Sequence, residues 1–341
     1  MAAKVVAFDV DETLGNFSQF SYFGHTLGQY FNKPDIMYRY FNDLVDLYPE
    51  IIRPNMVRIL DYIRKKKNAG VCSKVMIYTN NMGPDKWVAH IRSYFENKLR
   101  SMHPHSGGGG GTRSGGAGGL LIVPPLFDHT IGGFKPQNER TASASAYPER
   151  TTTHKTVNEF IRCGRLPADI EICFLDDVEH PKMVDERVYY IKLQAYHSYI
   201  PFEMFVVRFL NSALYRDVFS HFQVPSITPG TSSAVKSHIL SIEMNNLLVK
   251  IAEAAEYDVK ANQRKVNPRE IDEIISKYIV YHLQQFFRDG LAASTSSTKA
   301  NSRNKTSKKN SRASSLNRRR VYYIDKNTAV KNMKNKTIRN R

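Results

Sequence analysis

The sequence predicts an α/β protein built on a parallel central sheet. Three observations along its 341 residues point to this class. Apolar runs of strand length occur at 5–8, 75–78 and 170–175, and each is followed by acidic or hydroxyl residues. Segments with apolar residues at helical spacing separate the runs, and this alternation is typical of parallel sheets. Because open α/β sheets bind ligands at the carboxyl ends of their strands, the polar residues after each run are candidates for a functional site.

The first apolar run is followed at once by Asp9 and Asp11. Two carboxylates at this spacing can hold a hard cation through oxygen. They can also divide a reaction between them, one attacking an electrophile while the other moves a proton. Taken alone, D-x-D-x-T is equally well explained as a strand followed by an acid-rich turn. The functional interpretation therefore depends on the rest of the chain.

Residues 16–52 are rich in aromatic side chains, and apolar residues within 37–48 repeat at helical spacing. Ordinary packing is the simplest explanation for them. Pro54 begins a clear helix, since proline suits the first helical turn. Basic residues at 64–67 and Gly70 mark its end. The apolar face of this helix consists of Met56, Ile59, Leu60 and Ile63.

The second apolar run is followed by Thr79 in a Thr-Asn-Asn sequence. A hydroxyl and backbone amides at a strand end can hydrogen-bond a phosphoryl oxygen, although the same three residues also form common turns. Residues 106–119 are almost entirely glycine and small polar residues, and this predicts a flexible loop. A phosphate-cradling loop is disfavoured there, because no G-K-[ST] ending follows the glycines.

The third apolar run ends in the adjacent pair Asp176 and Asp177. Neighbouring carboxylates on a buried strand repel each other unless a cation lies between them, and Mg²⁺ is a physical reason for the pair. Upstream, Lys155 stands where a helical pattern begins, which directs a fixed cation toward the edge of the sheet. Lys135, in G-F-K-P, competes for this role. Without the other motifs, either lysine is an ordinary surface residue.

Four motifs in this order resemble those of the haloacid-dehalogenase (HAD) superfamily of phosphohydrolases. They are D-V-D-E-T-L at 9–14, Thr79, Lys155 and the Asp176-Asp177 pair. The resemblance covers about residues 4–195 and implies a Rossmann-like three-layer sandwich. D-x-D-E-T-L, the later D-D and the I-R-P at 52–54 are similar to the branch that contains the carboxyl-terminal-domain phosphatases of RNA polymerase. The run from F-I-R-C at 160–163 to H-P-K-M at 180–183 is similar to uncharacterised superfamily members from large DNA viruses.

The resemblance implies a Mg²⁺-dependent phosphatase that works through an aspartyl-phosphate. Asp9 would attack phosphorus, while Asp11 would protonate the leaving oxygen and then activate water. Thr79 and Lys155 would bind the phosphoryl oxygens. The substrate class stays open between phosphoprotein, nucleotide, polynucleotide end and small metabolite.

The same resemblance implies a metal site made of carboxylates. Asp9, the backbone carbonyl of Asp11, and Asp177 would hold Mg²⁺. Asp176 would either ligate through water or orient its neighbour. The cofactor expected for this chain is therefore Mg²⁺ alone.

We expect three regions along the chain. Residues 1–225 form the catalytic domain, in which 16–52 serves as a flap or small cap and 106–119 as the glycine-rich loop. Residues 226–290 form a helical region, with amphipathic patterns at 235–257 and after a capping box at 267–270. Residues 291–341 form a disordered basic tail.

The tail carries 15 Lys or Arg against one acidic residue, Asp325, and so holds +14 of the net charge of +17. Such a segment suits a nucleic acid or another polyanion, bound through residues 292–341. Residues 321–324 form a short apolar island within it that could dock on a surface. An alternative function follows: a nucleic-acid-binding or scaffold protein with little turnover.

Three cysteines without C-x-x-C spacing favour a reducing compartment and argue against a disulfide framework or a zinc site. The N-terminus lacks a signal-peptide pattern, and no apolar run is long enough to span a bilayer. We expect an intracellular protein, cytoplasmic or nuclear, without a membrane partner; for a viral protein this means the host cell.

Overall fold

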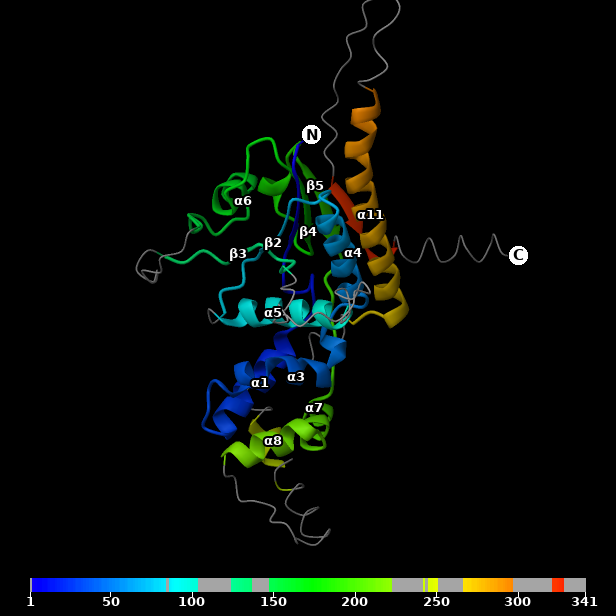
Figure 1. The fold of residues 1–341 in the computed structure, drawn as a ribbon. Helices are drawn as coiled ribbons and strands as arrows, with labels where there is room; N and C mark the ends of the chain where they lie inside the picture. The colour runs from blue at the N-terminus through cyan, green and yellow to red at the C-terminus, as the bar shows by residue number, and fades with distance from the viewer. Residues whose placement is uncertain are drawn as a thin grey trace, which may run out of the picture.

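The apolar runs become the strands of one six-stranded sheet in the computed structural model of the chain (Figure 1). The structure describes residues 2–83, 86–103, 124–136, 147–222, 242, 245–250, 266–296 and 321–327. The strands are β1 (Lys4–Phe8), β2 (Lys74–Tyr78), β3 (His129–Ile131), β4 (Glu171–Asp176), β5 (Val188–Leu193) and β6 (Val321–Ile324). Every pairing is parallel, which confirms the predicted α/β class with a parallel sheet.

The strand order is β3-β2-β1-β4-β5-β6. The chain builds outward from β1 through β2 to β3, and then returns to add β4, β5 and β6 on the other side of β1. The order therefore reverses between β1 and β4, and open α/β sheets bind ligands at such a switch point. The two acidic motifs follow these two neighbouring strands.

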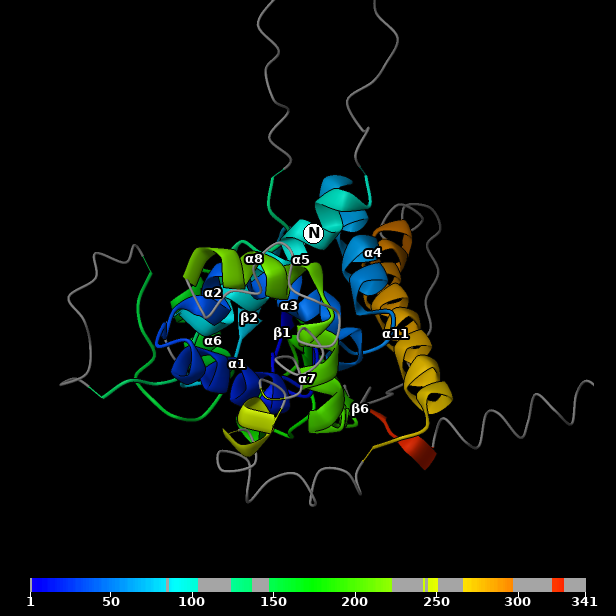
Figure 2. The same ribbon diagram turned by 90° about the horizontal axis from the view of Figure 1, so that it is seen from below.

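Helices cover both faces of the sheet because every strand of a parallel sheet is buried on both sides. On β1, Val6 and Phe8 face a core shared with α4 (Met56–Asn68), α5 (Lys86–Ser101) and α11 (Arg269–Ser296). Val5 and Ala7 face the opposite core, which α6 (Val157–Gly164) covers. Figures 1 and 2 both show α4 and α11 side by side, on the side of the sheet away from α6.

The aromatic segment 16–52 folds into helices that lie beyond one end of the sheet (Figure 1). They pack with two later helices, and their aromatic rings form the joint core. Phe23 contacts Tyr48 and Phe205 at ring-centroid distances of 5.5 and 5.3 Å, and the Tyr48 hydroxyl donates to the Phe205 carbonyl at 2.7 Å. The elements are α1 (Ser18–Tyr30), α2 (Ile36–Arg39), α3 (Phe41–Leu47), η1 (Pro49–Ile51), α7 (Phe202–Leu210) and α8 (Ala213–Phe222).

The C-terminal region differs from the expected disordered tail. Residues 321–324 form β6 on the edge of the sheet, so the prediction of disorder is wrong for them. The Tyr322 ring stacks on Tyr189 at 4.3 Å, and Ile324 is buried. The gain from these apolar contacts explains why a short island in a polar segment becomes ordered. Helix α11 also continues past the expected boundary at 290, to Ser296.

Several predictions fall on residues outside the described ranges. These include the glycine-rich loop at 106–119, most of the amphipathic pattern at 235–257, and most of the basic tail. Across the described part of the chain, no helix is both long and apolar enough to cross a membrane.

Candidate active site

Three buried carboxylates meet at the switch point between β1 and β4. Because Phe8 pairs with Leu175, the residues that follow, Asp9 and Asp176, reach the same edge of the sheet. Asp9, Asp176 and Asp177 are 7%, 0% and 6% exposed. Each of the three offers an oxygen within 4.8 Å of those of the other two. The register of two parallel strands thus brings together acids that are more than 160 residues apart.

Lys155 lies against two of these carboxylates. Its Nζ is 2.7 Å from Asp9 Oδ1 and 2.6 Å from Asp176 Oδ2, and the side chain is 2% exposed. Its position is set by the start of α6, where the Thr156 side chain caps the helix by accepting the Glu159 N–H at 3.0 Å. Of the two lysines that the sequence offered for this role, Lys155 is the one that contacts Asp9. Lys135 lies in the segment that follows β3.

Asp176 has partners at both of its oxygens. Oδ1 accepts the Val178 N–H at 2.7 Å, and Oδ2 contacts Lys155 and also His180 Nε2, at 3.3 Å. Although burial opposes its charge, the hydrogen bonds from His180 and Lys155 hold the pKa of Asp176 below its ordinary value. This arrangement suits a carboxylate that orients its neighbours. In the sequence, His180 has no signal beyond its place in the H-P-K-M run.

Asp177 is tied to the first motif through Thr13. The Thr13 hydroxyl donates to Asp177 Oδ1 at 3.0 Å, and the same hydroxyl accepts the Asp177 backbone N–H at 3.1 Å. This pair of bonds explains why a hydroxyl residue follows the two acids of D-x-D-x-T. Among the described residues, no hydrogen bond reaches Asp177 Oδ2.

The three carboxylates of this cluster carry more negative charge than the single lysine in contact with them offsets. Burial raises the pKa of Asp9 to about 6, with Asp176 and Asp11 adding to the rise while Lys155 opposes it. Burial also raises the pKa of Asp177 to about 7, and the charges of Asp9 and Asp176 add to the effect. A set of oxygen donors with excess negative charge fits a hard divalent cation.

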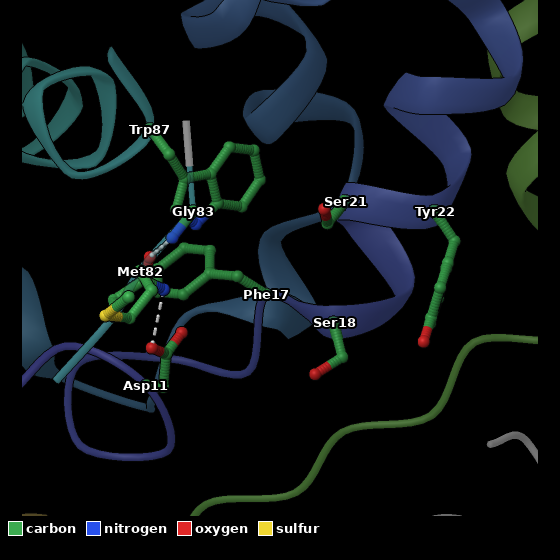
Figure 3. A pocket seen from close by; sticks show the side chains of 9 residues that line it. Asp11, Phe17, Ser18, Ser21, Tyr22, Met82, Gly83 and Trp87 are labelled. Atoms are coloured by element: carbon green, nitrogen blue, oxygen red, sulfur yellow. Dashed lines mark hydrogen bonds between the residues drawn. The ribbon is translucent and has the colours of Figure 1, made fainter. Parts of the chain in front are cut away.

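Asp11 lies at the mouth of the site. Asn81 Nδ2 donates to Asp11 Oδ2 at 2.7 Å, and burial raises the pKa of Asp11. The next residue, Glu12, has a left-handed backbone with φ of 54°, which turns the chain sharply after Asp11. Asp11 also lines a pocket of about 370 Å³ between α1 and the segment that leads into α5 (Figure 3).

Thr79 follows β2 at the same edge of the sheet as Asp9, as the pairing of Phe8 with Ile77 requires. It is buried, and its hydroxyl accepts the Asn81 N–H at 3.0 Å. The guanidinium of Arg150 fixes this loop by donating to the Thr79 carbonyl at 3.1 Å and to Asn80 Oδ1 at 2.7 Å. Arg150 carried no signal in the sequence, because its partners are about 70 residues away.

The Arg53 side chain holds the loop after β1 through hydrogen bonds to its backbone carbonyls. Its buried guanidinium donates to the carbonyls of Thr13 at 2.7 Å and Gln194 at 2.9 Å, and also to that of Glu12. Burial lowers its pKa to about 10, while the nearby carboxylates of Asp272 and Asp177 oppose the shift. Arg53 is thus a second fixed cation near the acidic cluster, and the sequence marked it only as part of I-R-P.

These observations define the chain as an α/β protein with a buried carboxylate–lysine site at the switch point of its sheet. Comparison of the chain with protein-family models, with curated proteins and with solved structures found no match.

Proposed function

We propose that this protein is a Mg²⁺-dependent phosphatase of the HAD type, which hydrolyses a phosphate monoester. One observation carries the proposal: the carboxylates of Asp9, Asp176 and Asp177 gather at the sheet edge, and Lys155 bridges two of them. Carboxylates can attack an anionic phosphoryl group only where positive charge offsets the repulsion. A lysine and a divalent cation would together meet that need.

In the proposed reaction, a carboxylate oxygen of Asp9 forms a bond to phosphorus while the ester P–O bond breaks. Asp11 gives its proton to the departing oxygen, and its raised pKa supports a role as the acid. Asp11, now ionised, takes a proton from water, whose oxygen attacks phosphorus and releases Asp9 and inorganic phosphate. Thr79 and Lys155 hold the phosphoryl oxygens during both steps.

The residues present fit Mg²⁺, because the donors are carboxylates with excess negative charge. Asp9, Asp177 and the backbone carbonyl of Asp11 would hold the ion, which supplies positive charge to the phosphoryl oxygens. Asp176 takes the positioning role, because its oxygens already hold Lys155, His180 and the Val178 N–H.

The proposal is tested by hydrolysis of para-nitrophenyl phosphate with the full chain, in Mg²⁺ and then in EDTA. We expect turnover in Mg²⁺, loss of turnover in EDTA, and recovery when Mg²⁺ is restored. Turnover of equal rate in EDTA would contradict a metal-dependent reaction, and no turnover with any phosphate monoester would favour the binding function.

The second candidate, binding of a nucleic acid or another polyanion, is favoured by the concentration of charge near the C-terminus. Residues 297–320 alone carry nine Lys or Arg and no acid. Deletion of 292–341 would also remove β6, so the sharper variant replaces these nine residues with Gln. We expect the log–log salt slope of single-stranded DNA binding to fall by several units. An unchanged slope would exclude this segment as the binding element.

A further inference from the structure

The pocket beside Asp11 has walls of two different kinds. Phe17, Met82 and Trp87 form an apolar wall, in which the Phe17 and Trp87 rings meet edge to face at 6.4 Å (Figure 3). Trp87 is held from behind by Phe20 and Phe41, at centroid distances of 6.2 and 5.7 Å. The ring that faces the pocket is therefore fixed, and fixed aromatic faces are suited to binding flat groups.

Hydroxyl groups form the other wall. Ser18, Ser21 and Tyr22 lie three and four residues apart on α1, so they share one face of the helix, across the pocket from Trp87. Among the described residues that line the pocket, none is Lys, Arg or His, and the only charged side chain is Asp11. An occupant with its own negative charge would therefore meet no cation among these lining residues and would face the carboxyl group of Asp11.

The position of Asp11 decides which part of a substrate enters this pocket. In the proposed reaction, Asp11 protonates the ester oxygen, so the group attached to that oxygen lies on the pocket side of Asp11. The aromatic wall begins within the same pocket. A ring joined directly to the ester oxygen would reach this wall, and its polar substituents would meet the hydroxyls of α1.

We propose that the leaving group is a neutral aromatic alcohol, so that the substrate class is an aryl phosphate. This inference rests on the proposed phosphatase function and goes beyond it by naming the substrate class. Two sources share the chemistry: a small aryl phosphate, and a phosphotyrosine side chain in a peptide. In both, the P–O bond breaks and Asp11 supplies the proton that the departing phenol oxygen takes.

Trp87 is the only tryptophan in the chain, so its fluorescence reports directly on occupancy of the pocket. The full-length protein in Mg²⁺ is titrated with phenylphosphonate and with propylphosphonate, neither of which can be hydrolysed. We expect phenylphosphonate to bind about tenfold more tightly and to change the Trp87 emission. Equal affinities, or tighter binding of propylphosphonate, would overturn the inference.

Two variants keep the test independent of folding defects. Phe17→Leu retains apolar volume and is expected to weaken the binding of phenylphosphonate about fivefold without changing the affinity for propylphosphonate. Tyr281→Leu, which removes an exposed ring on α11, is the control.

Ser21→Lys is at an exposed position and adds a cation to the pocket. It should raise kcat/KM for 4-carboxyphenyl phosphate about fivefold relative to phenyl phosphate. No change in this ratio would contradict the placement of the leaving group.

Hydrolysis of four substrates distinguishes a small aryl phosphate from a phosphotyrosyl peptide. It also distinguishes failure of this inference from failure of the proposed phosphatase function. Phenyl phosphate, a neutral phosphotyrosyl peptide, a matched phosphoseryl peptide and a nucleoside 5′-monophosphate are compared in Mg²⁺. Preference for either aryl ester supports the inference and identifies the source. Mg²⁺-dependent hydrolysis that favours the phosphoseryl peptide or the nucleotide overturns the inference while the phosphatase proposal stands. No hydrolysis of any of the four overturns both.

Discussion

Replacement of Asp9 with Asn is expected to lower kcat for para-nitrophenyl phosphate by about 10⁴-fold or more. The amide has the size of the carboxylate but is a poor nucleophile, so the aspartyl-phosphate cannot form. Lys155 still has Asp176 as a partner at 2.6 Å, and the fold is expected to survive the change. The measurement is steady-state hydrolysis in Mg²⁺, with circular dichroism to confirm folding.

The matched control is Asp169→Asn. Asp169 is exposed and precedes β4, so it lies at the opposite end of the strand from Asp176. This variant should retain the full rate. Equal activity in Asp9→Asn and the unmodified protein would exclude Asp9 as the nucleophile and would leave the carboxylate cluster without a catalytic role.

Replacement of Asp177 with Asn is expected to stabilise the metal-free protein at pH 8 by about 4 kcal/mol. The folded protein raises the pKa of Asp177 from 3.8 to about 7 by burial and by the charges of Asp9 and Asp176. A raised pKa means that the folded state binds this proton more tightly than the unfolded chain. The contribution of this proton to stability is therefore complete below about pH 4 and is lost as the pH rises through 7.

The same variant should respond differently to pH and to metal. In EDTA, we expect urea denaturation to show that the gain over the unmodified protein is large at pH 8 and small at pH 4. Mg²⁺ should stabilise the unmodified protein at pH 8, because a bound ion offsets the carboxylate charges, and should stabilise Asp177→Asn much less. Asp169→Asn again serves as the control. A destabilised Asp177→Asn, or an equal response of both proteins to Mg²⁺, would contradict a metal site at Asp177.

Much of the central sheet was predictable because its strands are locally apolar. The runs at 5–8, 75–78 and 170–175 became β1, β2 and β4 almost residue for residue. The acids that follow β1 and β4 were predictable at the same edge of the sheet, because parallel strands end at the same edge. That these two strands are adjacent is known only from the structure. The resemblance implied Lys155 as the lysine of the site, with Lys135 as its competitor, and the structure places Lys155 in contact with Asp9.

Other parts of the site had no local signal. Arg53 and Arg150 donate to backbone carbonyls of distant loops, and an arginine that bonds carbonyls looks in sequence like any surface arginine. The aromatic segment after the first motif predicted packing, but the pocket wall needs α1 to lie opposite Trp87. Which face of a helix lines a cavity depends on its neighbours, and these come from α5 and α7.

Three features of this protein are encoded by its residues alone: an α/β pattern, acids and a hydroxyl at strand ends, and a concentration of basic residues near the C-terminus. These features are local, since a strand or a charge run is encoded by adjacent residues. Two other features, the order of the strands and the assembly of the acidic cluster, depend on pairing between segments that are far apart in the sequence. Strand β6 joins β5 across more than 120 residues, and three aspartates from two strands become one cluster through the register of β1 and β4. Burial of apolar surface stabilises such pairings, and that energy depends on partners that no single segment contains.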